Sequence, residues 1–162
     1  MSNNYYVKER MFAFGAKFDV YDKNGKEIFY AEADKFDIGK NISIYKSDGG
    51  RKVLYMEQQI RIGAHKYEVF DLDGIHVATI KKEFMTPVYN ISGKYGNIIM
   101  ESNSIFGRNY NVFKEGVIIG AIEKEWNIFG KDRYSLIVKD KDYTIFLVGL
   151  LIMIDMIRFH ED

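Results

Sequence analysis

A run of ten consecutive apolar residues, 145–154, constrains the fold more than any other feature of the sequence. It is too long for an ordinary strand, and its flanks are typical of a helix. Asp142 is placed to be the N-cap, while Arg158 and His160 suit the negative end of the helix dipole. A helix that is apolar on every side has to be buried on every side, in a protein core or in a bilayer.

Length and charge favour the protein core. A helix that crosses a membrane needs about 20 predominantly apolar residues, whereas Asp155 interrupts this run after ten. A charge near the middle of a bilayer costs at least a few kcal/mol. We therefore expect a buried core helix and not a transmembrane protein, with a membrane tail as the alternative.

The rest of the chain repeats a hairpin pattern. Alternating apolar and polar residues, rich in β-branched and aromatic types, predict half-buried strands. Tight-turn signals such as Asn24-Gly25 and Asp73-Gly74 separate these strands, because both pairs tolerate the positive φ of two-residue turns. Six positions are equivalent in six two-strand units: Val20, Ile44, Val69, Ile91, Val112 and Leu136.

Six such units predict about twelve strands joined mostly by short turns. Around eight strands enclose a space that side chains alone can fill, and larger barrels need something more inside. The chain supplies one helix without a polar face. The sequence therefore predicts an all-β fold with one helix, an antiparallel closed barrel of about twelve strands around a buried C-terminal hydrophobic α-helix, as a single domain over residues 1–162.

Composition narrows the classes of function. The 23 basic residues balance 23 acidic ones, which argues against a nucleic-acid partner. There is no Cys, so disulfides, thiolate metal sites and a catalytic Cys are excluded. The N-terminal segment has charges at Lys8, Glu9 and Arg10 and no apolar stretch of signal-peptide length, so we expect a cytoplasmic protein.

Catalytic and cofactor-binding motifs are not found. His65, His76 and His160 do not have the spacing of metal ligands, and the chain has neither a nucleophile elbow nor a phosphate-binding loop. We expect no enzymatic activity, no cofactor and no metal site. Asp155 is expected to reach the rim of the barrel or to pair with a basic side chain, because an unpaired buried charge is costly.

Three segments near the N-terminus have a familiar order and spacing: VKER at residues 7–10, FAFGAKFDV at 12–20 and DKNG at 22–25. Together with the closing apolar helix and its late Asp155, they resemble LURP-one-related proteins over essentially the whole chain, least around residues 94–104. That family belongs to the Tubby C-terminal-like superfamily, which also contains phospholipid scramblases. The resemblance implies a twelve-stranded barrel around a central C-terminal helix.

The resemblance implies much less about function. Tubby domains bind phosphoinositides through basic surface residues, but those positions find no residue-by-residue match in this chain. Scramblases place calcium-binding acidic residues near their terminal helix, whereas this chain has only Asp140 and Asp142 nearby, without a recognisable loop. The family name LURP-one-related implies no general biochemical activity.

Basic residues near the ends of two equivalent strands form the candidate site. Lys81 and Lys82 end one repeat strand, Lys124 holds the corresponding place in another, and Lys131 and Arg133 follow it. If these repeats are neighbours in the barrel, the charges converge on one rim and can attract anionic head groups, each contributing about 1 kcal/mol. The alternative is a solvated strand edge whose lysines oppose aggregation.

These observations favour a non-enzymatic binding module, cytoplasmic and peripheral to the membrane, that engages an anionic phospholipid, a small ligand or a protein partner. One alternative is a purely structural or regulatory protein-interaction domain without lipid affinity. The other is a membrane-anchored, scramblase-like protein that uses residues 145–154 as its anchor.

Overall fold

The computed structural model describes residues 3–12, 15–34, 41–61, 64–82, 86–102, 109–125 and 133–161. Within these residues the chain forms twelve strands followed by a helical segment. The strands are β1 (Asn3–Phe12), β2 (Gly15–Asp22), β3 (Glu27–Asp34), β4 (Asn41–Lys46), β5 (Lys52–Arg61), β6 (Ala64–Asp71), β7 (His76–Lys82), β8 (Val88–Gly93), β9 (Ile98–Ser102), β10 (Asn109–Lys114), β11 (Val117–Glu125) and β12 (Arg133–Val138). A short 3-10 helix, η1 (Lys141–Tyr143), leads into the α-helix α1 (Thr144–Glu161).

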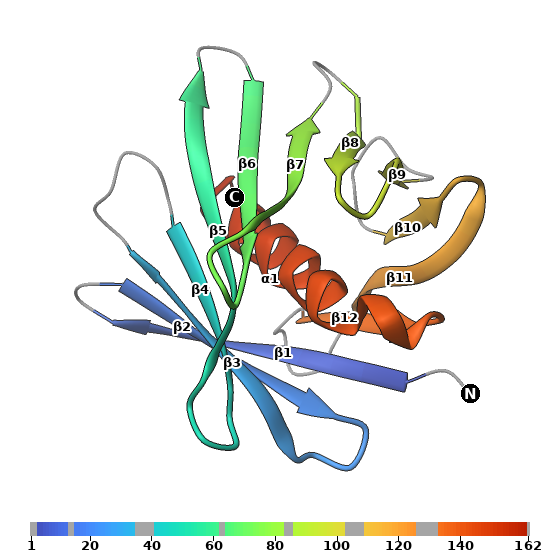
Figure 1. The fold of residues 1–162 in the computed structure, drawn as a ribbon. Coiled ribbons are helices and arrows are strands. Elements are labelled where there is room, and N and C mark those ends of the chain that lie inside the picture. Colours follow the sequence, from blue (N-terminus) through green and yellow to red (C-terminus); the bar gives the residue numbers. More distant parts are fainter. Residues whose placement is uncertain are drawn as a thin grey trace.

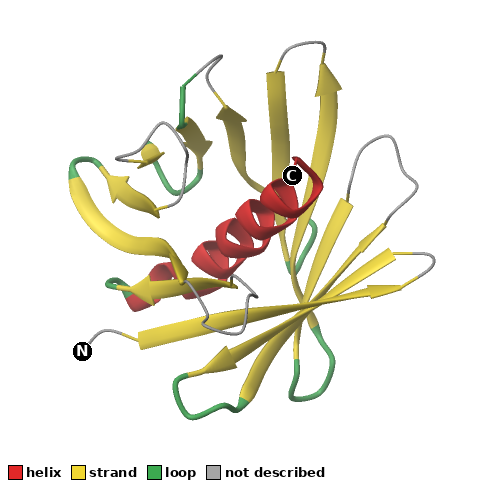
Figure 2. Cartoon of the chain, turned by 180° about the vertical axis from the view of Figure 1, so that it is seen from behind, coloured by secondary structure: helices red, strands yellow, loops and turns green. Residues whose placement is uncertain are grey.

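The strands form one closed antiparallel barrel in which sequence neighbours are also neighbours in space (Figure 1). Pairing of β1 with β12 closes the barrel, with Asn3 opposite Val138 and Tyr6 opposite Ser135. The helix α1 lies in the middle, and the strands surround it in both views (Figures 1 and 2). The predicted fold class, a closed barrel around one C-terminal helix, is confirmed.

The helix fills the barrel because its apolar side chains contact the wall on every side. Leu147, Val148 and Leu150 through Ile154 have no exposed surface. Burial of side chains of this size contributes about 1.5–3 kcal/mol each, so α1 supplies a large part of the core. Two glycines allow a close approach between helix and wall: Gly149 faces β5, and Gly120 on β11 faces the side chain of Leu147.

The start of the helix differs from the prediction. Asp142 was expected to be the N-cap, but it lies inside η1, and Asp140 caps that 3-10 turn: its side-chain Oδ1 accepts a hydrogen bond from the Asp142 backbone N at 3.1 Å. The prediction was wrong because the chain makes one 3-10 turn before the α-helix, which moves the cap toward the N-terminus. Lys114 Nζ then donates to the Tyr143 hydroxyl at 2.5 Å and links this turn to the end of β10.

The sequence repeat is visible as a repeated irregularity in the sheet. In four hairpins the register shifts directly after one of the equivalent apolar positions, Val20, Ile44, Val69 or Val112. A bulge of this kind increases the local twist of a strand and re-aims the side chain that follows it. The sequence repeat therefore determines the positions of the strands and also the point at which each of these four hairpins bends.

Two of the predicted turns are built alike. Asp22 Oδ1 accepts hydrogen bonds from the backbone N of Asn24 and Lys26, at 2.8 and 3.0 Å. Asp71 Oδ1 accepts the equivalent pair from Asp73 and Ile75, at 2.9 and 3.0 Å. The following glycines have a positive φ, 82° at Gly25 and 77° at Gly74, which suits a residue without Cβ. Because the strands alternate in direction, these turns lie at the end of the barrel where α1 begins.

Candidate functional site

The interior of the barrel is occupied by α1, so side chains that can meet a partner lie on the outer wall and at the ends. On that wall, an outward-facing aromatic residue follows each of the four bulges. These residues are Tyr21, Tyr45, Phe70 and Phe113. The inward positions before them, such as Ile44 and Val69, have no exposed surface.

Rings and lysines stack across the outer wall from β2 to β5. Lys17 Nζ lies 4.9 Å from the centre of the Tyr30 ring. That ring stacks on Tyr45, with centroids 5.0 Å apart and planes at 15°. Lys52 Nζ lies 5.8 Å from the Tyr45 ring and 5.4 Å from the Tyr55 ring. Each such contact between an ammonium group and a ring contributes about 0.5–1 kcal/mol at an exposed site.

The same row continues across β6 and β7. The Tyr55 and Phe70 rings have centroids 6.1 Å apart, and the His76 ring meets Phe70 edge-on at 5.5 Å. We refer to the whole row as the aromatic belt: Lys17, Tyr30, Tyr45, Lys52, Tyr55, Phe70 and His76. It crosses six neighbouring strands, β2 to β7; its Tyr and Phe rings are half-buried, whereas His76 is exposed.

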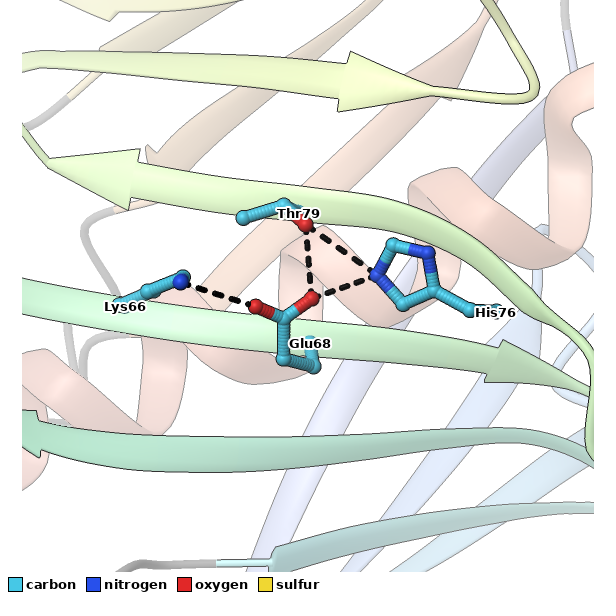
Figure 3. A network of polar contacts seen from close by, with 4 residues as sticks. All are labelled: Lys66, Glu68, His76 and Thr79. Carbon is cyan, nitrogen blue, oxygen red and sulfur yellow. Dashed lines mark hydrogen bonds and ion pairs between the residues drawn. The ribbon is translucent and has the colours of Figure 1, made fainter.

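At the β7 end of the belt, a polar network surrounds the carboxylate of Glu68 (Figure 3). Glu68 Oε2 lies 2.5 Å from His76 Nε2 and accepts a hydrogen bond from the Thr79 hydroxyl at 2.7 Å. Lys66 Nζ lies 3.2 Å from the other oxygen, Oε1. Burial acts to raise the pKa of Glu68, but the hydrogen bonds from Thr79, His76 and Lys66 and the Lys66 charge together hold that pKa below its ordinary value.

The network has the residue types of a nucleophile, a base and a carboxylate, but not their geometry. A catalytic triad uses the two different nitrogens of the imidazole, one toward the nucleophile and one toward the carboxylate. Here the Thr79 hydroxyl, at 3.2 Å, and the Glu68 carboxylate both contact the same nitrogen, Nε2 of His76. The arrangement orients the side chains of two neighbouring strands and does not prepare the Thr79 hydroxyl for attack.

A second charged cluster lies beyond the other end of the belt. The side chain of Asp19 on β2 is only 3% exposed although it faces outward. The Arg10 guanidinium contacts both carboxylate oxygens, with Nε 2.8 Å from Oδ2 and Nη2 3.1 Å from Oδ1. Lys17 Nζ lies 3.9 Å from Oδ1. Two cations thus surround one carboxylate, and this cluster carries a net positive charge.

The structure places the predicted basic residues at one end of the barrel but not together. Lys81 and Lys82 end β7, and Lys124 lies near the end of β11, with three strands between β7 and β11. Lys81 is exposed and lies opposite Lys66, which contacts Glu68. Arg133 begins β12 opposite Glu125, and Lys131 lies outside the described residues. The two repeats that carry the lysines are therefore not neighbours, and a shared patch of all five stays a prediction.

Asp155 was expected to reach the rim of the barrel or to pair with a basic side chain, and the second of these alternatives differs from what the structure shows. Its described partner is not a basic side chain but Glu9 on β1, with which it forms a hydrogen bond inside the barrel. Burial raises the pKa of Asp155 to about 6, and the hydrogen bond with Glu9 acts in the opposite direction. Two carboxyl groups in contact are stable when they share a proton, because two adjacent buried charges of one sign repel each other.

The belt is the feature that the sequence analysis missed. A signal was present, because Tyr21, Tyr45, Phe70 and Phe113 each follow one of the equivalent apolar positions directly. Alternation along a strand assigns those four residues to the outside, but it does not show that rings from adjacent strands contact one another. That contact depends on the register and on the bulges.

Two further features of the described residues bear on function. No group of three or more His, Asp or Glu side chains is arranged to hold a metal ion in the part of the chain that the structure describes. Over the same residues, no helix is long and apolar enough to span a bilayer. The helix α1, although apolar, contacts the barrel wall that surrounds it.

The chain is an antiparallel barrel filled by its own C-terminal helix, with ionic and aromatic contacts along the outer wall. These features define its structural class. A family model described as LURP-one-related matches residues 3–155, and the chain belongs to that family. One relative is the uncharacterized protein YxjI of Bacillus subtilis (strain 168), 23% identical over 159 residues that make up 97% of this chain and 94% of the relative. No solved structure matches the chain.

Proposed function

We propose that this protein is a non-enzymatic binding module that holds an anionic membrane surface against the outer wall of its barrel. The observation that carries this proposal is the aromatic belt, a row of rings across neighbouring strands in which Lys17 and Lys52 lie against the rings. Aromatic rings favour the interface between lipid and water, and lysines favour anionic head groups.

The charge of the belt supports an anionic partner. Asp19 is matched by Arg10 and Lys17, and Glu68 is matched by Lys66. These two carboxylates therefore do not cancel Lys52, whose ammonium group lies between two rings. Arg10, Lys17, Lys52 and Lys66 against Asp19 and Glu68 leave two net positive charges, while the exposed Glu32 and Glu57 lie on the same wall. Each net charge contributes about 1 kcal/mol near an anionic surface, so the electrostatic attraction is weak and the binding reversible.

The turn between β6 and β7 adds an apolar contribution. Leu72 is 47% exposed and Ile75 is 54% exposed, and this turn joins β6, which ends in Phe70-Asp71, to β7, which begins with His76. Exposed apolar side chains at a hairpin tip can enter the boundary between head groups and acyl chains, where their burial is favourable. The basic belt and this apolar tip together suit a peripheral contact, with the protein in the cytoplasm and at the membrane surface.

Two alternatives lead to different measurements. A protein-interaction domain without lipid affinity would leave vesicles unbound, and a membrane-anchored scramblase-like protein would require detergent for extraction. The burial of α1 inside the barrel argues against its use as an anchor, because its apolar surface is already covered. Quantitative recovery in the soluble fraction without detergent would exclude the anchored form.

Vesicle flotation tests the proposal. We expect the protein to float with vesicles that contain phosphatidylserine and not with vesicles of phosphatidylcholine alone, and high salt should release it. The double variant Lys17→Glu/Lys52→Glu should reduce binding at least about tenfold, since it reverses two charges. Its matched control is Lys94→Glu/Lys139→Glu, which reverses two exposed charges on parts of the chain outside β2 to β7. Absence of binding to anionic vesicles at low salt would remove the lipid proposal.

A further inference from the structure

The outer wall of β9, β10 and β11 has a different character from the belt. Phe113 occupies the same place after a bulge as Tyr45 and Phe70 do, but its cross-strand neighbours are the aliphatic residues Ile99 and Ile118. Ile99 is 42% exposed and Ile118 is 40% exposed. Tyr45 and Phe70 each contact another ring from an adjacent strand, whereas Phe113 makes no ring contact with any residue that the structure describes.

The wall is hollowed at this point. A surface hollow of about 380 Å³ is lined by Asn97, Ile99, Glu101, Phe113, Glu115 and Gly116. Its floor is apolar, and its polar rim is acidic. Val117, the first residue of β11, is 66% exposed and extends the apolar surface.

The two carboxylates lie at opposite ends of the hollow. Ile99 and Phe113 lie opposite each other at the centre of the hollow. Glu101 is opposite Asn111, two residues from that centre toward one end. At the other end, the Glu115 backbone N donates to Asn97 O, which places Glu115 two residues beyond the centre. Four residues of extended chain span about 13 Å. Neither carboxylate is in an ion pair with any residue that the structure describes, although the Lys114 ammonium group is close enough to Glu115 for the two charges to attract each other.

An apolar floor between two exposed carboxylates about 13 Å apart along the strands suits a particular kind of occupant. In an extended segment, side chains i, i+2 and i+4 point to one side. A segment of the form Lys-x-Phe-x-Lys, or the same pattern with Arg or another large apolar residue, therefore presents one apolar group between two cations at the matching separation. Charge complementarity of this kind selects the partner and disfavours acidic segments.

We propose that the hollow on β9 and β10 is a docking site for an extended segment of a protein partner, in which a large apolar residue lies between two basic residues. This site does not depend on the lipid function of the belt, because the belt lies on β2 to β7 and the hollow on β9 and β10. A protein bound to a membrane through the belt would keep this second surface available.

Titration with three blocked peptides, followed by nuclear magnetic resonance, tests this inference. The probes are Gly-Lys-Ser-Phe-Ser-Lys-Gly, the acidic counterpart with Glu in place of both Lys, and the polar counterpart with Ser in place of Phe. We expect shifts in the signals of Ile99, Phe113 and Gly116 with the first peptide. Its affinity should be at least tenfold higher than that of the other two, and it should weaken as salt is raised.

The variant Glu101→Lys/Glu115→Lys should weaken binding of the first peptide at least tenfold, and it should bind the acidic peptide instead. Glu32→Lys/Glu57→Lys is the matched control, because it reverses two exposed charges on the outer wall of β3 and β5. A circular dichroism melt establishes that each variant is folded. The proposal is overturned if no peptide shifts these signals, if the acidic peptide binds the unaltered protein equally well, or if the shifts map to the belt. Concentration-dependent dimerisation that the Glu101/Glu115 variant abolishes would assign the hollow to a second copy of the chain and would also overturn it.

Discussion

Gly149, in the middle of α1, lies directly against Leu54 of β5. A Cβ atom added to residue 149 would be 2.7 Å from Leu54 Cδ2 and 3.2 Å from Met56 Sδ. A glycine in the middle of a helix costs about 1 kcal/mol relative to alanine. The contact with Leu54 therefore explains why the most buried part of the core contains a residue that disfavours helix formation.

This contact predicts a strong coupling between the two positions. Gly149→Ala alone should lower the free energy of unfolding by about 1–3 kcal/mol, because it overpacks the core. Leu54→Ala alone should cost about 2–5 kcal/mol, since it leaves a cavity. In the Leu54→Ala background, Gly149→Ala should become neutral or stabilising. Chemical denaturation of the four proteins measures this cycle, and additive effects of the two substitutions would contradict the close packing.

The burial of α1 predicts that a leucine-to-aspartate substitution lowers stability far more in the helix than in an exposed turn. Leu150 has no exposed surface, so Leu150→Asp places a charge in the apolar core and should abolish the cooperative unfolding transition. Leu72→Asp changes the same side chain at a turn where it is 47% exposed, and it should alter stability by less than about 0.5 kcal/mol. Thermal melts followed by circular dichroism compare the two. A cooperative melt of the Leu150 variant near the wild-type Tm would show that α1 is not the centre of the core.

Substitutions at two glycines with positive φ distinguish the cost of backbone strain from the cost of a steric clash. At Gly93, with φ 143°, an added Cβ would lie 2.4 Å from the Val77 carbonyl oxygen, whereas at Gly25, with φ 82°, nothing lies within 4 Å. Gly25→Ala should cost about 1 kcal/mol from strain alone. Gly93→Ala should cost about 3 kcal/mol or more, because the backbone of β7 has to move. Equal losses in a denaturant titration would argue against the close approach of these two strands.

The carboxyl pair predicts a pH dependence of stability. Burial raises the pKa of Asp155 to about 6 from the ordinary value of 3.8, so the folded protein holds this proton more tightly than the unfolded chain does. The stability from this group is complete below pH 3.8 and is lost as the pH rises through about 6. Asp155→Asn removes the cost of ionising this buried carboxyl group at high pH. The substitution should therefore raise the free energy of unfolding by about 2 kcal/mol more at pH 8 than at pH 4.

A matched substitution isolates that effect. Asp48 is exposed in the turn between β4 and β5, and Asp48→Asn should change the free energy of unfolding by a similar amount at both pH values. The comparison uses urea titrations of the three proteins at several pH values. A stabilisation by Asp155→Asn that does not grow with pH would show that Asp155 is not protonated preferentially in the folded state.

Sequence patterns predicted the barrel and its central helix because both depend on local periodicity and on the need to bury residues 145–154. The cap was misplaced by one 3-10 turn, since Asp140 and Asp142 are equally suitable capping residues and only the path of the chain distinguishes them. The partner of Asp155 could not be predicted, because Glu9 is distant in sequence and approaches only after the barrel closes. The belt and the hollow depend in the same way on which outward side chains face each other across strands.

The closure of β1 on β12 also bears on how the chain folds. These two strands lie at opposite ends of the barrel sequence, and the helix that fills the interior follows both of them. A ribosome would therefore release all twelve strands before the segment that gives them a core. Contacts this distant in sequence slow the search for the native state and leave strand edges open to association meanwhile. Nascent chains of this protein should consequently depend on chaperones until α1 emerges.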